Sequence, residues 1–392
     1  ALSRGASRCT FVDNAEVDRY ETPFGIRSIE FDAERGFLLN GRSVRFQGVC
    51  MHHDLGALGA AVNRRAVERQ IELLKEMGCN ALRTSHNPPA PEVLDACDRL
   101  GLVVLDEAFD EWRAGKVENG YSTLFEAWAE KDLRAMIRRD RNHPSVIMWS
   151  TGNEIREQGQ PDGVKVAQFL TDICHDEDPT RPVTAGFNNA DAAIANGFGE
   201  AVDVPGWNYK PFNYARYREE HPNWVMYGSE TSSCVSSRGE YYFPAKQKDD
   251  YREETLHITS FDIAHPPWGY IPDVEFAALD DNPHILGEFV WTGFDYLGEP
   301  TPYKAEWPSR SSYFGIFDLC GLPKDRYYLY KSRWSGEDVL HLLPHWTWEG
   351  MKGKPVSVHC YTNYDTVELF LNEKSLGVRE KNPADVLGRY RL

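Results

Sequence analysis

The chain has 392 residues, of which 41% are hydrophobic, so it is long enough for one large domain and parts of others. Its formal net charge of -17 argues against a nucleic-acid partner, because such a partner favours a basic surface. No apolar run approaches the roughly 18 residues that cross a bilayer, so we expect no membrane partner. The 8 cysteines show no Cys-x-x-Cys spacing, which argues against a structural zinc site and leaves the compartment open.

The amino-terminal part of the sequence is polar and carries short alternating stretches, such as residues 27–31, which predict one or two β-strands. So short a segment cannot form a domain alone. We therefore expect residues 1–35 to be the end of an immunoglobulin-like β-sandwich whose start is absent from the sequence. Residues 37–42 contain the pair Asn40-Gly41, which predicts a hairpin turn.

From residue 44 onward, short apolar stretches alternate with amphipathic stretches. The predicted strands cover residues 45–51, 81–85, 102–105, 145–154, 182–185, 202–209, 224–230 and 285–291. The predicted helices cover residues 63–77, 92–100, 124–139, 164–174 and 214–219. A long insertion rich in Tyr, Pro and Trp follows the seventh strand. These strand–helix units indicate an α/β fold, a (β/α)₈ TIM barrel, which we place at residues 36–337.

Beyond the barrel the sequence returns to simple alternation of polar and apolar residues. Residues 356–361 and 366–371 predict two strands, and residues 372–375 predict the turn that follows them. We therefore expect residues 338–392 to be the start of a carboxy-terminal β-sandwich domain. The predicted fold is a TIM barrel that is flanked on both sides by immunoglobulin-like β-sandwich segments.

Two glutamates stand at the ends of predicted barrel strands. Glu154 ends the fourth strand, whose uncharged apolar run predicts burial, and Glu230 ends the seventh. Catalytic residues of TIM barrels lie at the carboxyl ends of the strands, so we expect these side chains to converge across one mouth. A single glutamate is more often a solvated loop residue, but here two placements coincide. A pair of carboxylates, one protonated and one ionised, is the equipment of glycoside hydrolysis.

Other carboxylates compete for these two roles. Asp106 and Glu107 end the third strand and are the second choice, and Glu111 follows them closely. Glu288 lies inside the eighth strand, so we expect it to satisfy an internal polar network instead.

Further candidate side chains follow strands at the same face of the barrel. Arg83 could hold a carboxylate ionised, or it could form an ordinary ion pair elsewhere. Tyr209 and Trp291 also end strands, and the tryptophan offers either a flat apolar face to a sugar ring or plain core packing. Histidines follow the first two strands, namely His52, His53 and His86. No helical His-x-x-x-His spacing is present, which favours hydroxyl binding over metal binding.

Seven motifs occur in a fixed order between residue 44 and about residue 330. They are Gly48-Val49-Cys50-Met51-His52-His53, Arg83-Thr84-Ser85-His86-Asn87-Pro88, Asp106-Glu107-Ala108, Asn142-His143-Pro144-Ser145-Val146, Gly152-Asn153-Glu154, Tyr227-Gly228-Ser229-Glu230-Thr231 and Gly287-Glu288-Phe289-Val290-Trp291. With these motifs the chain resembles glycoside hydrolase family 2, and within it the large multidomain β-galactosidases. The sequence is similar to such an enzyme without its amino-terminal sugar-binding domain.

The resemblance implies a retaining mechanism and a role for each candidate residue. Glu154 matches the family's acid/base, and Asn153 matches the residue that hydrogen-bonds the sugar 2-hydroxyl. Glu230 matches the nucleophile, which Arg83 and Tyr209 would support. The remaining matches are to sugar-binding positions, namely His52, His86 and Trp291.

Two departures from the family bear on metal binding and on sugar choice. Some family galactosidases hold magnesium through a Glu-x-His sequence, where this chain has Glu111-Trp112-Arg113. We therefore expect no metal and no cofactor. Family glucuronidases bind the substrate carboxylate through an Asn-Lys pair before a Gly-Ile-Phe sequence, where this chain has residues 312–314 without either residue. Arg238 or Lys246 of the long insertion could still supply the missing charge.

These observations predict an exo-acting, retaining β-galactosidase that acts on a β-galactoside oligosaccharide or polysaccharide and that could form a homo-oligomer. The alternatives are a β-mannosidase or β-glucuronidase of the same family, or a non-catalytic glycan-binding relative. The presence of both Glu154 and Glu230 argues against a non-catalytic relative.

Overall fold

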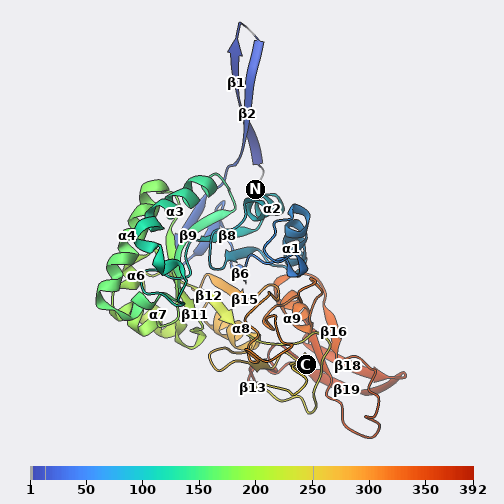
Figure 1. Cartoon of the computed structure of the whole chain (residues 1–392). Helices are drawn as coiled ribbons and strands as arrows, with labels where there is room; N and C mark the ends of the chain where they lie inside the picture. Colours follow the sequence, from blue (N-terminus) through green and yellow to red (C-terminus); the bar gives the residue numbers. More distant parts are fainter. Residues whose placement is uncertain (1–2, 14, 250) are drawn as a thin grey trace.

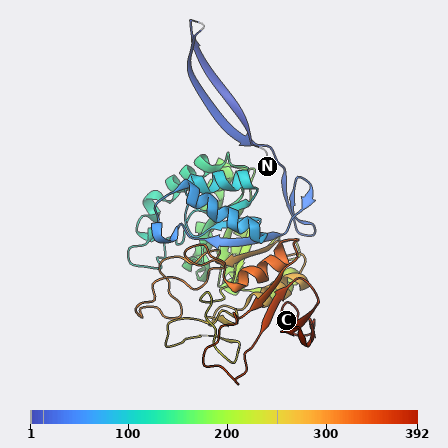
Figure 2. The ribbon, with the colours of Figure 1, turned by 90° about the vertical axis from the view of Figure 1, so that its right-hand side faces the viewer.

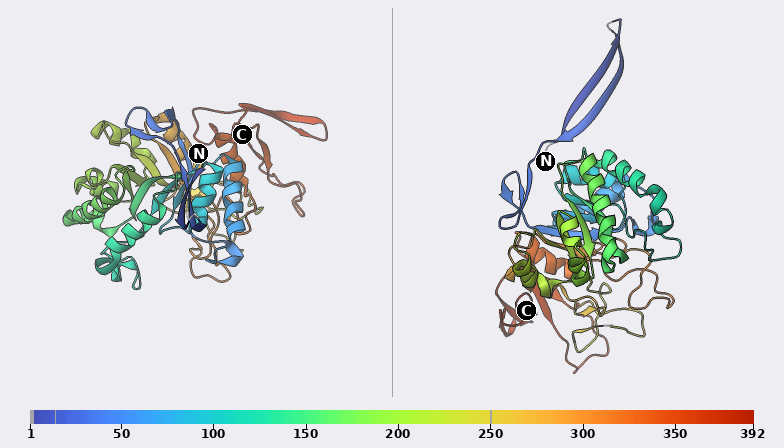
Figure 3. Two further views of the ribbon diagram at one scale, coloured as in Figure 1. Left: turned by 90° about the horizontal axis from the view of Figure 1, so that it is seen from above. Right: turned by 90° about the vertical axis from the view of Figure 1, so that its left-hand side faces the viewer.

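The computed structural model describes residues 3–13, 15–249 and 251–392. Within these residues, eight parallel strands close into a barrel, and helices lie around it (Figure 1; Figure 3). The barrel strands are β6 (Phe46–Met51), β7 (Ala81–Thr84), β8 (Val103–Glu107), β9 (Val146–Asn153), β10 (Val183–Phe187), β11 (Val204–Asn208), β12 (Tyr227–Ser232) and β15 (Gly287–Trp291). The predicted TIM barrel is confirmed.

Each barrel strand leads into one or two helices. They are α1 (Arg64–Met77), α2 (Pro91–Leu100), α3 (Phe125–Asp140), α4 (Val164–Glu177), α5 (Ala190–Ala195), α6 (Phe198–Ala201), α7 (Tyr214–Glu220), α8 (Pro272–Asp281) and α9 (Asp325–Trp334). Short 3₁₀ helices cover Gly56–Leu58, Tyr121–Thr123, Arg156–Gly159, Pro161–Gly163 and Pro211–Asn213.

Helix α1 shows how the sequence sets its own boundaries. The Asn63 side chain accepts a hydrogen bond from the Ala66 backbone N–H, which caps the start of the helix. Gly78 ends it with a φ of 101°, a left-handed conformation that glycine adopts without strain. The buried face is formed by Val67, Ile71, Leu74 and Met77. The helix lies against the barrel beside α2, as its amphipathic pattern predicts (Figure 2).

Helix α8 is not predicted by the sequence pattern because it buries polar residues together with apolar ones. Glu275 on this helix is fully buried, and it accepts hydrogen bonds from the hydroxyls of Tyr214 and Tyr270 at 2.8 and 2.6 Å. A helix whose buried face is partly charged lacks the amphipathic signal that reveals α1.

Aromatic side chains fill the amino-terminal half of the barrel. The Phe46 ring lies 5.6 Å from Phe289 and 6.4 Å from Tyr227, so β6, β15 and β12 meet there. The Tyr227 hydroxyl reaches Thr184 Oγ1 on β10 at 2.8 Å. These side chains close the lower part of the barrel, and the open space therefore lies at the carboxyl ends of the strands.

Antiparallel strands flank the barrel at both ends of the chain, as expected for sandwich segments. β1 (Ser3–Val12) and β2 (Ala15–Gly25) form a hairpin that stands away from the barrel (Figure 1; Figure 2). β3 (Ile29–Asp32), β4 (Gly36–Leu39) and β5 (Arg42–Ser43) form a small sheet, in which Asn40-Gly41 makes the predicted turn. The other flanking strands are β16 (Leu340–Leu343), β17 (His359–Thr362), β18 (Thr366–Leu371) and β19 (Lys374–Glu380).

The insertion after β12 contains the short pair β13 (Lys248–Asp249) and β14 (Ala264–His265). The domain limits near residues 35 and 338 remain predictions, and β3 pairs with β4 across the first of them. In the part of the chain that the structure describes, no helix combines the length and the apolar character needed to span a membrane.

Candidate active site

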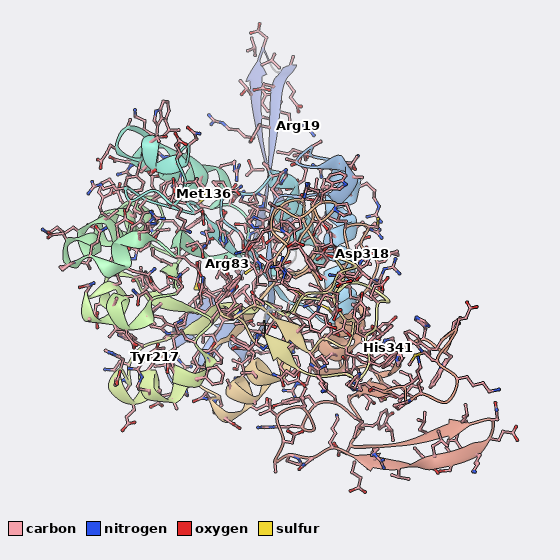
Figure 4. The ribbon with its side chains drawn as sticks, turned by 60° about the horizontal axis from the view of Figure 1, so that its bottom comes forward. Arg19, Arg83, Met136, Tyr217, Asp318 and His341 are labelled. Carbon is pink, nitrogen blue, oxygen red and sulfur yellow. The ribbon has the colours of Figure 1, made fainter. Side chains whose placement is uncertain are left out.

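A cavity of about 690 Å³ opens at the carboxyl ends of the barrel strands. It is lined by His52, His86, Asp110, Asn153, Glu154, Asn188, Tyr209, Lys210, Glu230, Trp268, Trp291, Glu299 and Phe314. The cavity therefore brings together every candidate that the resemblance gave a role, except Arg83. The Arg83 side chain is only 1% exposed, and it reaches the cavity residue Glu230 through a hydrogen bond. Figure 4 labels Arg83 near the centre of the molecule.

Glu230 is the most firmly held carboxylate of the cavity. It is 5% exposed and lies on β12, where the Arg83 Nη1 donates to its Oε2 at 3.0 Å and the Tyr209 hydroxyl donates to its Oε1 at 2.6 Å. Burial raises the pKa of Glu230 above its ordinary value, and the charge of Glu154 raises it further. The charges of His86 and Arg83 and the Tyr209 hydrogen bond act in the opposite direction.

Arg83 joins this carboxylate to a second, deeper one. Its Nε and Nη2 donate to the two oxygens of Glu107 at 2.9 and 3.1 Å, while its Nη1 binds Glu230. Glu107 is fully buried, and its pKa is nevertheless lowered, because the charges of Arg83 and His86 outweigh the effect of burial. Glu107 was the second choice for catalysis, but it lies beneath the cavity and positions other side chains.

Glu154 has much looser surroundings. It directly follows β9, with a φ of 44°, and its backbone N–H donates to the Gly186 carbonyl at 2.8 Å. Among the described residues its carboxylate receives one side-chain hydrogen bond, from Asn208 Nδ2 to Oε1 at 3.1 Å. Lys210 lies close enough for the charge of Glu154 to raise the lysine pKa, although burial lowers that pKa overall.

Both polar atoms of the Asn153 side chain form hydrogen bonds with neighbouring side chains. Its Oδ1 accepts from Arg83 Nη2 at 2.8 Å and from Asn208 Nδ2 at 3.1 Å. Its Nδ2 donates to Asp110 Oδ1 and to His86 Nε2, each at 3.2 Å. A sugar hydroxyl that binds Asn153 must therefore share one of these hydrogen bonds.

A glycine makes this close packing possible. A Cβ placed on Gly186 would lie 3.0 Å from both Arg83 Nη2 and Asn208 Oδ1. Contacts this short are tighter than ordinary van der Waals distances, so any side chain here would displace the polar groups that hold the two catalytic candidates.

Three aromatic rings form one wall of the cavity. The His86 ring stacks on Trp291 with centroids 5.3 Å apart and planes at 5°, and the His52 ring meets Trp291 edge-on at 5.1 Å. Nδ1 of His86 lies 2.6 Å from Glu107 Oε1, which fixes the ring. Burial and the neighbouring His86 lower the pKa of His52 to about 4, so His52 is neutral near neutral pH.

Several candidates named from the sequence lie outside the cavity. The His53 ring contacts the Ala60 carbonyl at 3.0 Å, so it is not part of the site. Asp106 is fully buried, and burial together with Asp140 raises its pKa well above the ordinary value. Glu288 is 1% exposed and accepts a hydrogen bond from Thr231 Oγ1 at 2.8 Å, which agrees with the predicted internal polar role.

Protein groups engage the residues that the resemblance aligns with a magnesium site, Glu111-Trp112-Arg113. The carboxylate of Glu111 accepts hydrogen bonds from the backbone N–H groups of Ser122, at 2.8 Å, and Lys116. Trp112 donates to the Thr151 carbonyl, and Arg113 pairs with Glu126. Over the described ranges of the chain, no group of three or more His, Cys, Asp or Glu side chains is arranged to hold a metal ion.

Other lining residues were not identified from the sequence. They come from loops that follow the strands, and they are Asp110, Asn188, Lys210, Trp268, Glu299 and Phe314. Asp110 accepts a hydrogen bond from Lys116 Nζ at 2.8 Å, and the same ammonium donates to the Asn153 carbonyl. Trp268 is 51% exposed at the cavity, which is unusual for so large an apolar side chain.

Comparison with known proteins identifies the family to which this chain is similar. Residues 32–207 match the family model of the TIM barrel domain of glycosyl hydrolases family 2, and residues 353–392 match a domain of unknown function. A β-galactosidase from Bacteroides ovatus is 45% identical in an alignment of 406 positions, which covers 93% of this chain and 47% of that protein. A β-glucuronidase from Bacteroides fragilis is 27% identical, over 93% of this chain and 52% of that protein.

The fold is likewise shared with a solved relative. The crystal structure of a β-glycosidase from Bacteroides vulgatus matches with a TM-score of 0.83 and 36% identity, covering 95% of this chain and 50% of that one. The chain spans about half the length of these relatives. Because residues 32–207 match the family model and 93% of the chain aligns with a member at 45% identity, the chain belongs to glycoside hydrolase family 2.

Proposed function

We propose that this chain is a retaining, exo-acting β-galactosidase that removes terminal galactose from an oligosaccharide or a polysaccharide. The observation that carries the proposal is the pair Glu154 and Glu230, which come from the ends of two barrel strands and share one cavity. Two carboxylates that face each other across a sugar site are what retaining glycosidases require.

In the first step, the Glu230 carboxylate attacks the anomeric carbon, and the bond from that carbon to the leaving oxygen breaks. Glu154 gives its proton to the leaving oxygen, so the departing group is a neutral alcohol. The hydrogen bonds from Arg83 and Tyr209 hold both oxygens of Glu230 in place and stabilise its charge before the attack.

In the second step, Glu154 is a carboxylate and takes a proton from a water molecule. The water oxygen attacks the anomeric carbon, and the bond to Glu230 breaks, which restores the free enzyme. The anomeric configuration is inverted twice and so retained. The looser surroundings of Glu154 suit a group that exchanges protons with the leaving group and then with water.

The charges that line the cavity support a neutral sugar. Among the described residues, the cavity-lining carboxylates are Asp110, Glu154, Glu230 and Glu299, against one lysine, Lys210. A uronic acid would bring a further negative charge into this cavity, and an uncompensated buried carboxylate is costly. Arg238, which could have supplied a countercharge, pairs instead with Asp318 at 2.7 Å and does not line the cavity.

A β-glucuronidase is the second candidate, because some relatives carry that name and because Lys210 lines the cavity. Lys210 already lies near the charges of Glu154 and Asp191, which reduces its capacity to bind another anion. No cationic side chain stands at residues 312–314, where family glucuronidases place their carboxylate-binding pair.

The test is a comparison of kcat/KM on nitrophenyl β-galactoside, β-glucuronide, β-mannoside and β-glucoside. We expect the galactoside to be cleaved about a hundredfold faster or more than the glucuronide, which corresponds to a discrimination of about 3 kcal/mol. Comparable rates on these two substrates would refute the galactosidase assignment. The absence of turnover on all four substrates, together with sugar binding, would support the non-catalytic alternative.

A further inference from the structure

Glu299 is a cavity-lining carboxylate that the proposed mechanism does not use. It belongs to the segment after β15, beyond Trp291, and it was not identified from the sequence. Its residue is exposed, so its side chain can meet a ligand in the cavity. A charged group that lines a sugar site without serving the reaction is a candidate for recognising the sugar itself.

The protein holds Glu299 in one place. The Tyr296 hydroxyl donates a hydrogen bond to Glu299 Oε2, and the Tyr296 ring is itself packed 4.6 Å from His52 and 5.9 Å from Trp291. The adjoining backbone is anchored as well, since the Gly298 N–H donates to the Arg310 carbonyl at 2.8 Å. Glu299 is therefore fixed against the aromatic wall of the cavity.

One oxygen of this carboxylate remains available. In the structure as described, Oε2 receives the Tyr296 hydroxyl, and no protein donor contacts Oε1. Glu299 and Glu230 line the same cavity. A group with a free acceptor position, in the same cavity as the proposed nucleophile, is placed to bind a sugar in that cavity.

The location of Glu299 indicates which part of the sugar it meets. The anomeric carbon lies between Glu154 and Glu230 in the proposed mechanism. Glu299 lies with Trp291 and His52, at the end of β15 and beside β6, whereas Glu154 follows β9. Strands β15 and β9 are not neighbours in the barrel, so we expect Glu299 to meet the edge of the sugar away from the leaving group.

We propose that Glu299 binds a hydroxyl group of the non-reducing sugar through its free Oε1, and that its charge rejects sugars that carry a carboxylate. Glu299 is thus a specificity residue that makes the cavity selective for neutral hexosides. This inference rests on the proposed function, because it assigns the sugar preference of the same cavity. Hydrogen bonds to an ionised acceptor are the stronger ones, and a like charge opposite Glu299 is repelled.

The first experiment is the substitution Glu299→Gln, which keeps the size and the acceptor but removes the charge. The matched control is Glu306→Gln, in the same segment but outside the cavity. We expect E299Q to lower kcat/KM on nitrophenyl β-galactoside by roughly tenfold to a hundredfold, and to lower it less on the β-glucuronide. The galactoside-to-glucuronide ratio should fall by about tenfold or more in E299Q and stay unchanged in E306Q. A fall by the same factor on both substrates would contradict the proposal.

The second experiment identifies the hydroxyl and separates binding from a merely structural effect. Nitrophenyl galactosides that each lack one hydroxyl are compared on the wild-type chain and on E299Q, as a double-substitution cycle. For the hydroxyl that Glu299 binds, its removal should cost the wild type about tenfold but cost E299Q almost nothing. If removal of each hydroxyl lowers kcat/KM by the same factor in the wild type and in E299Q, Glu299 binds none of these hydroxyls.

Failure of the proposed function would look different from failure of this inference. If the wild type prefers another neutral glycoside, the galactosidase assignment falls, and the same cycle on that glycoside still tests Glu299. A wild-type preference for the glucuronide would overturn both. If no substrate is turned over, affinities of methyl β-galactoside and methyl β-glucuronide are measured by calorimetry, and equal ratios in the wild type and E299Q would overturn the inference.

Discussion

The surroundings of Glu230 and of Glu154 differ sharply, although both residues line one cavity. Glu230 is 5% exposed, and its two oxygens are bound by Arg83 and Tyr209. Glu154 follows its strand with a left-handed φ of 44° and receives, among the described side chains, a hydrogen bond only from Asn208. The Glu230 carboxylate is held in place by hydrogen bonds, and the Glu154 carboxylate remains accessible at the opening of the cavity.

This difference suits the two chemical roles that we propose for these residues. A nucleophile must meet the anomeric carbon at a fixed position and in its ionised form, which favours several donors and little freedom. A group that gives a proton and then takes one must reach a leaving group and a water molecule, which favours access. If the two residues have these different roles, substitutions near Glu230 and near Glu154 will change kcat/KM differently with leaving group and with pH.

The largest effect is expected for Glu230→Ala, which removes the proposed nucleophile. Turnover of nitrophenyl β-galactoside should fall on the order of 10⁵-fold or more, as for other enzymes that lose a covalent nucleophile. Added azide should restore part of the activity, because it occupies the space left by the carboxylate, and the product should be the galactosyl azide of inverted configuration. Rates without azide within about tenfold of the wild type would remove Glu230 from this role.

A smaller and substrate-dependent loss is expected for Glu154→Ala. On β-galactosides with poor leaving groups, kcat/KM should fall by roughly 10²–10⁴-fold, because the leaving oxygen no longer receives a proton. Activated aryl galactosides need little protonation and should lose much less in the same assay. The matched control is Glu200→Ala, an exposed glutamate of α6, which should leave both rates unchanged. Equal losses on both substrate types would show that Glu154 is not the acid.

The third prediction concerns the pH at which the proposed nucleophile, Glu230, loses its charge. Activity requires ionised Glu230, so kcat/KM is present above the pKa of Glu230 and lost as the pH falls through it. Burial and the charge of Glu154 raise that pKa, while the hydrogen bond from Tyr209 lowers it. The acid limb of the wild type, meaning the pH range in which kcat/KM falls as the solution becomes more acidic, should therefore lie above the ordinary glutamate pKa of about 4.3.

Two substitutions should shift this acid limb in opposite directions. Tyr209→Phe removes a stabilising hydrogen bond, so the limb should move to higher pH and kcat/KM at neutral pH should fall roughly tenfold to a hundredfold. Glu154→Gln removes a negative charge, so the limb should move to lower pH. Both are measured as kcat/KM against pH on an activated aryl galactoside. Shifts in the same direction would mean that the limb does not report Glu230.

The strand-end residues around Glu230 could be predicted from the sequence, for a physical reason. Buried parallel strands form uncharged apolar runs, so a polar residue at the carboxyl end stands out, as Glu230 and Arg83 do. The same logic found Glu107, but it could not tell a residue in the cavity from one beneath it, because both occupy strand ends. His53 misled the prediction since it adjoins His52, and neighbouring residues near a strand end point to different sides.

The loop residues that line the cavity were much harder to predict from the sequence. Lys210, Trp268 and Glu299 lie in loops, where no periodicity tells which side chain faces the cavity. Trp268 and Glu299 also belong to long irregular segments whose path depends on contacts between residues far apart in the sequence. The sequence therefore predicts the reaction better than the specificity.

The smallest effect is expected for Asn208→Ala, at a side chain that contacts the surroundings of both carboxylates. Asn208 donates to Glu154 and to Asn153, and it accepts from Ser229 Oγ at 2.6 Å, beside the nucleophile. Loss of the donor frees Glu154, while Arg83 and Tyr209 still hold Glu230. We therefore expect kcat/KM to fall only about tenfold, and to fall further for poor leaving groups than for activated ones.

A matched asparagine in the next segment provides the control. Asn213→Ala removes a hydrogen bond to the Tyr217 hydroxyl outside the cavity and should leave both substrate types unaffected. If Asn208→Ala instead slowed both substrate types equally and shifted the acid limb, the lost hydrogen bonds would be acting on Glu230. The same set of hydrogen bonds would then hold both carboxylates. The accessibility of Glu154 would in that case come from its backbone position rather than from its small number of hydrogen bonds.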